Sequence, residues 1–166
     1  MIKLKTLKNM ETTKTLQITT KTVKPKTYLC HTQKTTLAKM MDTAGELVDA
    51  LYEEVWQQKL EKDGVIEFIY LDFKPNDPFI LKIAMPVKAG ATITSNRFKL
   101  EETGEFKCVS YTYKGDVSKI GEVYEGLYGT LLGQGYKPTN QVREVYEKFV
   151  SLDSPENSTE IQIGIM

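Results

Sequence analysis

The stretch YLCHTQKTTLAKM, Tyr28 to Met40, combines a β-strand with the start of a helix. Its first residues mix β-branched, aromatic and polar side chains, as half-buried strands do, and its last residues begin a helical spacing of apolar side chains. The same pattern returns in CVSYTYKGDVSKI, Cys108 to Ile120, at a shift of 80 residues (108 minus 28). A strand that leads into a helix therefore occurs twice, and this repetition sets the predicted fold.

Two further pairs of segments extend the repeat. IEFIYLDF (Ile66 to Phe73) matches VREVYEKF (Val142 to Phe149) at a shift of 76, and KIAMPV (Lys82 to Val87) matches EIQIGI (Glu160 to Ile165) at a shift of 78. Shifts that change along the chain indicate loops of different length within a duplicated unit. Matches this short are also what two unrelated β-α-β-β units would give, so both explanations stay open at this point.

The spacing of apolar side chains predicts two helices, one roughly from Leu37 to Leu60 after a Thr35 or Thr36 cap, the other from about Ser118 to Gln134. Each helix has one apolar stripe that must be buried against the strands. The strands are predicted at Lys26–Thr32, Val65–Phe73, Phe79–Val87, Phe106–Tyr113, Val142–Phe149 and Glu160–Ile165.

This order of elements predicts an α+β fold. We expect two β-α-β-β repeats related by a pseudo-two-fold axis, forming an antiparallel sheet with two long helices on one face and a concave ligand-binding face. Residues 1–19, rich in lysine and threonine, are predicted to be a loosely ordered leader. Residues 20–166 then form one domain, with repeats at about 20–88 and 97–166.

Composition narrows the classes of function. The chain has 22 Lys and Arg against 22 Asp and Glu, so no basic field draws it to nucleic acid. It has neither a membrane-length apolar run nor a secretory signal, which predicts a cytoplasmic protein without a membrane partner. Cys30 and Cys108 are expected to be reduced thiols. One histidine, two cysteines and no phosphate-binding glycine motif predict no metal and no cofactor.

The closing strand contains the candidate ligand anchor. Ile161, Ile163 and Ile165 alternate toward a core, so Glu160 points to the other side of the sheet. Aromatic faces attract organic cations by roughly 0.5–2 kcal/mol each, and a nearby carboxylate adds charge pairing. The candidate residues for such a site are Glu160, Tyr146, Tyr111, Tyr113, Phe68, Tyr70, Trp56 and His31.

Each candidate also has an ordinary structural explanation. Strand tyrosines are commonly packing residues with a surface hydroxyl, and Trp56 also suits packing between helix and sheet. His31 also suits a surface position on its strand. Lys82 occupies the place of Glu160 in the first repeat, so these two residues could simply form an exposed ion pair with little net effect on stability.

Motifs in the second half resemble a known family. They are KGD at Lys114–Asp116, GYKP at Gly135–Pro138, REVY at Arg143–Tyr146 and TEIQI at Thr159–Ile163. Together they are similar to the gyrase-inhibitor-like (GyrI-like) effector-binding domain, the ligand-binding module of AraC-type and MerR-type multidrug-responsive transcription regulators. The resemblance is specific from about Phe106 onward and only architectural in the first half.

The resemblance implies a stand-alone small-molecule-binding protein, with no DNA-binding domain and no direct contact with nucleic acid. It implies a central pocket for small aromatic molecules or cationic amphiphiles, with Glu160 as the anchor and Tyr146 as a wall. The family's "GpY" motif is Gly115-Asp116-Val117 here, so one pocket aromatic is absent. The resemblance favours a binding protein over an enzyme and leaves the second open.

Two alternatives remain at this level. Some stand-alone members of the family are hydrolases of strained electrophiles, and here Glu160 would be the general base, assisted by Tyr111 or Tyr146. The domain could instead be an inhibitory or regulatory module that binds a protein partner or a second copy of itself. The sequence does not decide between these readings or name the ligand.

Overall fold

The structure, a computed structural model, describes residues 15–166 of the chain. Residues 1–14 of the predicted leader lie outside this range. The described helices are too short or too polar to span a membrane. The elements are β1 (Thr19–Val23), β2 (Thr27–Thr35), α1 (Leu37–Gln57), β3 (Glu67–Leu71), β4 (Phe79–Val87), β5 (Lys99–Glu102), β6 (Phe106–Lys114), the 3₁₀ helix η2 (Val117–Val123), α2 (Tyr124–Gly133), β7 (Pro138–Lys148) and β8 (Ser158–Ile165).

One eight-stranded sheet, in the order β1-β6-β8-β7-β3-β4-β2-β5, contains all the strands, and every neighbouring pair is antiparallel. The order is symmetric about its centre, because β6, β8 and β7 mirror β2, β4 and β3. The predicted α+β fold with two β-α-β-β repeats is therefore confirmed, and the six predicted strands are all present.

The pseudo-two-fold axis passes through the middle of the β3–β7 pair. Phe68 and Glu144 face each other in the register of these strands. The same two residues are equivalent in the repeat, since 144 minus 68 is 76, the shift that aligns the two segments. Glu144 thus lies at the centre of the molecule, opposite its own symmetry mate.

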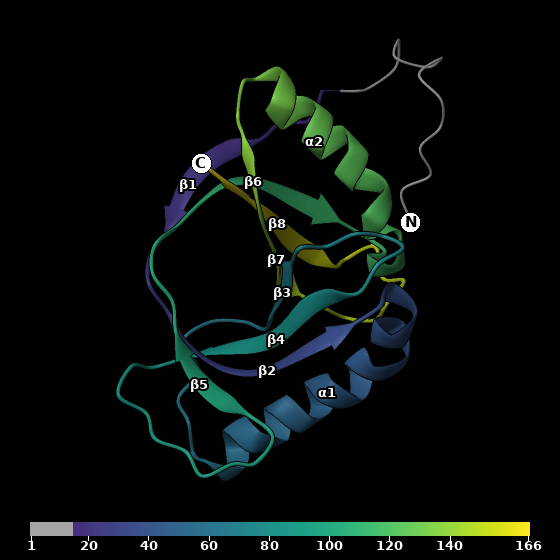
Figure 1. Cartoon of the computed structure of the whole chain (residues 1–166). Helices are drawn as coiled ribbons and strands as arrows, with labels where there is room; N and C mark the ends of the chain where they lie inside the picture. Colours follow the sequence, from purple (N-terminus) through teal and green to yellow (C-terminus); the bar gives the residue numbers. More distant parts are fainter. Residues whose placement is uncertain (1–14) are drawn as a thin grey trace.

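The strands β1 and β5, which the sequence did not predict, join each repeat to the other. β1 leads into β2 but pairs with β6, and β5 leads into β6 but pairs with β2. The two connections run side by side, with the Thr103 amide donating to the Lys26 carbonyl at 2.9 Å (Figure 1). Their sequences, TTKTV and KLEE, are short and polar, so they lack the alternation of apolar residues that marks a strand.

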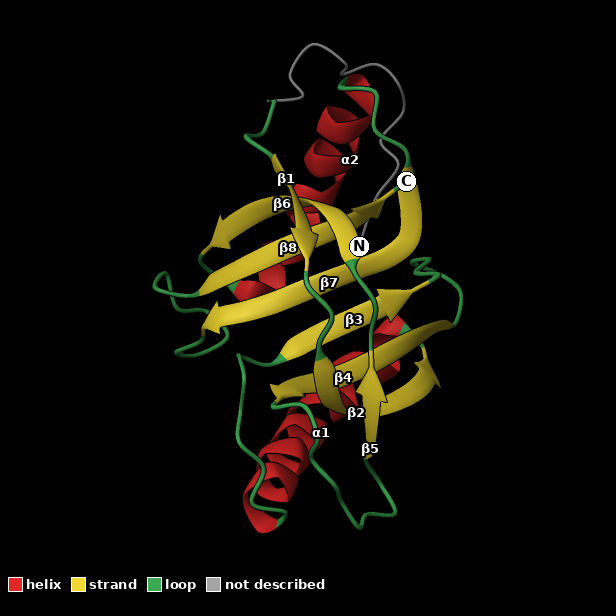
Figure 2. Ribbon diagram, turned by 90° about the vertical axis from the view of Figure 1, so that its left-hand side faces the viewer, coloured by secondary structure: helices red, strands yellow, loops and turns green. Residues whose placement is uncertain are grey.

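Both helices cover the same face of the sheet, which Figure 2 shows from the opposite side. The buried residues of α1 are Met40, Leu47, Leu51 and Val55, and the Thr36 hydroxyl caps its first turn. The second predicted helix is divided into η2 and α2. The apolar residues of η2 recur at intervals of three (Val117, Ile120, Val123), which is the period of a 3₁₀ helix.

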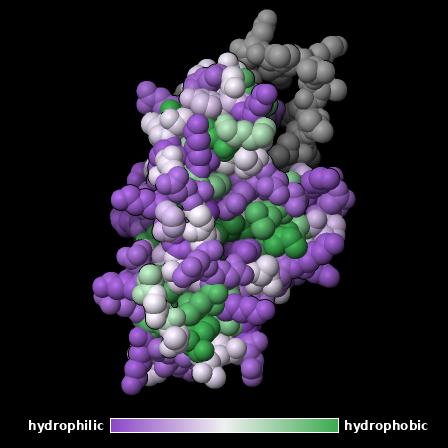
Figure 3. All heavy atoms as spheres, turned by 60° about the vertical axis from the view of Figure 1, so that its left-hand side comes forward, coloured by the Kyte–Doolittle hydropathy of each residue, from purple (hydrophilic) through white to green (hydrophobic). Residues whose placement is uncertain are grey.

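The other face of the sheet is curled inward by the crossing connections. Every residue of β8 is buried, on both of its faces, although antiparallel sheets commonly leave one face in water. On the face that Figure 3 shows, the surface is mostly hydrophilic, with hydrophobic residues in separate patches. The sheet therefore has two interiors, one under the helices and one inside the curl.

Gly164 fits a close approach between β7 and β8. It lies opposite the register shift between Pro138 and Val142, and a Cβ atom there would lie 2.9 Å from a ring carbon of Phe106 and too close to the Thr139 hydroxyl. Only a residue without a side chain allows the strands to pack in this way.

We predict that Gly164→Ala lowers the free energy of unfolding by about 1–3 kcal/mol, because the added methyl group overpacks this site. The matched change Gly133→Ala, at the end of α2, meets no heavy atom within 4 Å and should be neutral or slightly stabilising. Urea unfolding of the two variants measures the difference, and equal stabilities would contradict the close approach.

Candidate functional site

The carboxylate of Glu144 is the centre of the candidate site. Its side chain lies on the helix-bearing face, and the residue is only 4% exposed. Tyr124 donates its hydroxyl to Oε1 at 2.6 Å, while Tyr70 and Tyr146 donate to Oε2 at 3.0 and 2.7 Å. Three phenol groups therefore hold one buried carboxylate.

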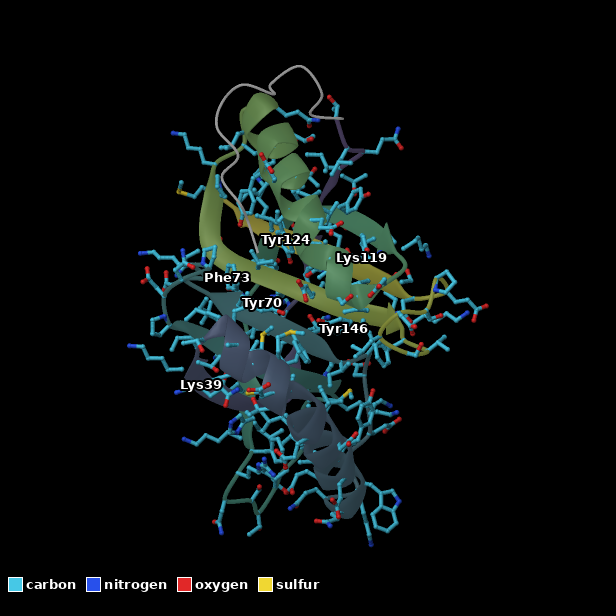
Figure 4. The ribbon with its side chains drawn as sticks, turned by 90° about the vertical axis from the view of Figure 1, so that its right-hand side faces the viewer. Lys39, Tyr70, Phe73, Lys119, Tyr124 and Tyr146 are labelled. Carbon is cyan, nitrogen blue, oxygen red and sulfur yellow. The ribbon has the colours of Figure 1, made fainter. Side chains whose placement is uncertain are left out.

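These tyrosines come from three different elements. Tyr70 lies on β3, Tyr146 on β7, and Tyr124 is the first residue of α2. Tyr70 and Tyr146 are equivalent in the repeat, since 146 minus 70 is 76, and both donate to the same oxygen. Figure 4 shows the three rings on the helix-bearing side of the sheet.

Aromatic side chains surround the carboxylate. Phe68, the symmetry mate of Glu144, packs edge-to-face on Tyr146 with ring centroids 5.0 Å apart. Tyr70 packs against Phe73 and Phe79 at 5.9 and 6.0 Å. The surroundings of Glu144 are thus apolar except for the phenol hydroxyls, which increases the strength of electrostatic interactions there.

No ion pair involving Glu144 occurs within residues 15–166. Burial raises the pKa of Tyr70, Tyr124 and Tyr146 well above the ordinary value, and the charge of Glu144 raises it further. The phenols therefore remain protonated donors. A buried carboxylate with neutral partners alone is costly, because its charge is solvated by hydroxyls but not neutralised.

The segment η2 and the first turn of α2, called the cover below, meet the site through Tyr124. The three buried residues of α2, Leu127, Thr130 and Leu131, lie beyond its first turn, and η2 has no buried residue. Tyr124, which reaches Glu144, stands at the junction of the two segments. Ile120, Val123 and Tyr124 are only partly buried against the core, so this segment has fewer fully buried residues than the rest of α2.

The structure separates the residues predicted from the sequence. Phe68, Tyr70 and Tyr146 adjoin Glu144. Tyr111 and Tyr113 lie on the same face, on β6, partly buried against the core. The others lie apart: Trp56 is 80% exposed at the end of α1, and His31 faces the Arg97 carbonyl beside Phe98.

Glu160 lies on the opposite face of the sheet from Glu144. Its register partner on β7 is Val145, and it forms an ion pair with Lys21 and accepts a hydrogen bond from Ser110 at 2.6 Å. Burial alone would raise the pKa of Glu160, but the hydrogen bonds from Lys21 and Ser110 outweigh burial and lower the pKa below its ordinary value. Its role as ligand anchor stays a prediction.

The sequence analysis did not select Glu144, although a signal was present. Val142, Glu144 and Tyr146 share one face of β7 by alternation, so a carboxylate stands between apolar residues. Its equivalent in the first repeat is Phe68, an apolar residue. A charged residue on an apolar strand face, at a position that is apolar in the sister repeat, is the pattern that identifies it.

Comparison with known proteins shows which family and which solved structures the chain is similar to. The model of the GyrI-like small molecule binding domain family matches residues 16–166. Among solved structures of the same fold is SAV2435 bound to tetraphenylphosphonium, with a TM-score of 0.65 and 12% sequence identity over 91% of this chain and 94% of that one. The EcmrR C-terminal domain has a TM-score of 0.72 and 17% identity over 90% of this chain and 97% of that one. A hydrolase encoded by lin2189 from Listeria innocua has a TM-score of 0.65 and 13% identity over 92% of this chain and 93% of that one. No curated protein matches the chain.

We predict that Tyr70→Phe destabilises the protein by about 1–3 kcal/mol, because a buried carboxylate loses one of its donors. Tyr52→Phe is the matched control, since Tyr52 is 43% exposed on α1 and should change stability by less than about 0.5 kcal/mol. Chemical denaturation compares the two. Equal effects would mean that the hydroxyl of Tyr70 contributes nothing through Glu144.

We also predict a loss of stability at alkaline pH. Tyr70, Tyr124 and Tyr146 have raised pKa values in the folded state, so the stability that they contribute is complete below about pH 10 and is lost as the pH rises toward their folded pKa values. In Glu144→Gln burial still raises these pKa values but the charge of Glu144 no longer does, so the loss of stability should end at a lower pH and be smaller in total. Urea unfolding from pH 10 upward measures the loss in both proteins, and identical pH dependences would contradict the coupling.

Proposed function

This chain belongs to the GyrI-like small-molecule-binding domain family, and from that premise we propose that it binds aromatic or amphiphilic organic cations at Glu144. One observation carries the proposal: a carboxylate buried among aromatic rings has three phenol donors and, within residues 15–166, no cationic partner. A cationic ligand would neutralise that charge.

Lipophilic cations fit this chemistry better than neutral molecules. The aromatic surroundings of Glu144 offer ring faces and edges to an aromatic ligand, and each cation–π contact contributes roughly 0.5–2 kcal/mol. The carboxylate adds an attraction that strengthens as water is excluded. Tetraphenylphosphonium, the ligand in the SAV2435 structure of the same fold, has both a delocalised positive charge and aromatic rings, and is a suitable probe.

Entry of a ligand requires the cover to move. In the closed form Glu144 is 4% exposed and Tyr124 lies against it. A ligand would displace η2 and the first turn of α2, and the hydroxyl of Tyr124 would give way to the cation. Tyr70 and Tyr146, which belong to the sheet, would keep their hydrogen bonds.

Several different cations should bind. Aromatic rings and a single carboxylate recognise positive charge and aromatic surface rather than a particular arrangement of polar groups. The movable cover adapts the volume of the site to the ligand. These features support the broad, multidrug-like specificity expected from the family resemblance.

The alternative hydrolase, with Glu160 as general base, has less support. A general base works best with a pKa near the working pH, whereas the ion pair with Lys21 and the hydrogen bond from Ser110 lower the pKa of Glu160. Glu160 also lies across the sheet from Tyr146, its proposed partner.

We predict that Glu144→Gln weakens the binding of tetraphenylphosphonium by roughly 10-fold to 100-fold, about 1–3 kcal/mol, while the side chain keeps its shape. Glu160→Gln is the matched control, because it removes a buried charge from the other face. Fluorescence or calorimetric titration of both variants and the parent measures the difference, with thermal unfolding as the check on folding.

The opposite result would assign the ligand to Glu160. If Glu160→Gln loses binding and Glu144→Gln retains it, the site lies inside the curl. If neither substitution changes the affinity, no buried carboxylate anchors the cation and the proposal fails.

A further inference from the structure

The curled face of the sheet, on the side away from the helices, contains a hollow. Its volume is about 280 Å³, and residues of β2, β3, β4 and β7 form its floor. Gly104, in the connection between β5 and β6, and Phe106, at the start of β6, form one wall. The volume is slightly below the roughly 300–1,000 Å³ of drug-binding pockets, which suits a small metabolite.

Arg143 is the buried charge on the floor of this hollow. The residue is 3% exposed, and its Nη1 donates to the Tyr28 hydroxyl at 3.2 Å. Its guanidinium stacks on the Phe106 ring, 4.0 Å from the centroid. The Gln141 side chain, oriented with its oxygen toward the guanidinium, accepts from Nε and Nη2 at 2.9 and 3.1 Å. All of these partners are neutral.

The buried acid that shares Tyr28 with Arg143 is already neutralised. Glu67, fully buried, forms an ion pair with Lys26 at 3.0 Å and accepts a hydrogen bond from Tyr28 at 3.1 Å. Burial, aided by the charge of Glu67, raises the pKa of Tyr28, so this residue stays a neutral phenol between Glu67 and Arg143. Within residues 15–166 no carboxylate forms an ion pair with Arg143.

The charged groups at the rim also compensate one another or stay in water. Lys82 donates to Glu101 at 2.6 Å, and Glu105 is exposed. Arg143 is therefore the charge in the hollow that lacks a counter-ion. Guanidinium groups bind carboxylates through two parallel hydrogen bonds, and an arginine does not lose its proton at physiological pH.

We propose that this hollow is a second binding site, for a small organic carboxylate, with Arg143 as its anchor. The carboxylate takes the place of the Gln141 amide oxygen at Nε and Nη2. The apolar part of the ligand lies against Phe106, Ile69 and Ala84, which line the same hollow. This site is distinct from the one at Glu144, because successive residues of β7 point to opposite faces.

Benzoate is the probe, and benzamide, with the same shape and no charge, is its matched control. Titration of ¹⁵N-labelled protein with benzoate, followed by NMR, should give saturable shifts for the backbone amides of the lining residues and for the Arg143 side chain. Benzamide should bind at least tenfold more weakly. Equal affinities would show that charge does not select the ligand and would overturn the proposal.

Arg143→Gln should weaken benzoate at least tenfold, whereas Arg97→Gln, the removal of an exposed arginine paired with Glu46, should leave its affinity unchanged. Gly104→Phe tests the site without removing the buried charge. The fold should tolerate this change, because a Cβ at Gly104 meets no heavy atom within 4 Å. The added ring narrows the hollow and should weaken benzoate by a similar factor.

The two sites are tested independently. Gly104→Phe should leave the affinity for tetraphenylphosphonium unchanged, so loss of benzoate alone assigns the carboxylate to the hollow. Absence of benzoate binding at millimolar concentrations, or the same affinity in Arg143→Gln and Gly104→Phe as in the parent, would overturn the second site. Failure of tetraphenylphosphonium to bind would overturn only the site at Glu144.

Discussion

The burial of the Glu144 carboxylate is the constraint around which the helix-bearing face is arranged. A charge in an apolar interior needs several hydrogen-bond donors, and here two of the three come from elements other than β7. Tyr70 ties β3 to β7, Tyr124 ties α2 to the sheet, and Tyr146, two residues from Glu144 on the same strand, adds a local donor. The position of α2 therefore depends on an electrostatic requirement as well as on its short apolar stripe.

The duplication explains why there is one carboxylate and not two. Phe68 and Glu144 are equivalent residues that face each other across the axis. Two glutamates there would place like charges side by side in a low-dielectric interior, at a cost of several kcal/mol. The repeat keeps the donors symmetric, with Tyr70 and Tyr146 on the same oxygen, and breaks the symmetry only at the acceptor. An asymmetric candidate site thus results from a nearly symmetric frame.

The sequence predicts the elements better than it predicts which of them meet. Alternation places Tyr146 with Glu144 on β7 and Glu160 opposite the isoleucines of β8, and both assignments hold. It does not reveal how the strands are aligned, and the observed register places Val145 beside Glu160 and so separates Tyr146 from Glu160. The exchange of β1 and β5 left no periodic signal either, because hydrogen bonds from polar segments hold these strands in place. Both the register of β7 with β8 and the exchange of β1 and β5 depend on pairing between distant segments, which a local sequence pattern does not show.

That exchange also accounts for the second interior. An open antiparallel sheet would leave Arg143 and Glu160 in water, where neither would need a special partner. When β1 pairs with β6, it brings Lys21 to Glu160, and the connection from β5 to β6 brings Phe106 over Arg143. The same contacts that join the two repeats therefore bury one charge with its counter-ion and another without one. A fold that is closed by swapping its leading strands acquires a polar cavity on the face that would otherwise be its surface.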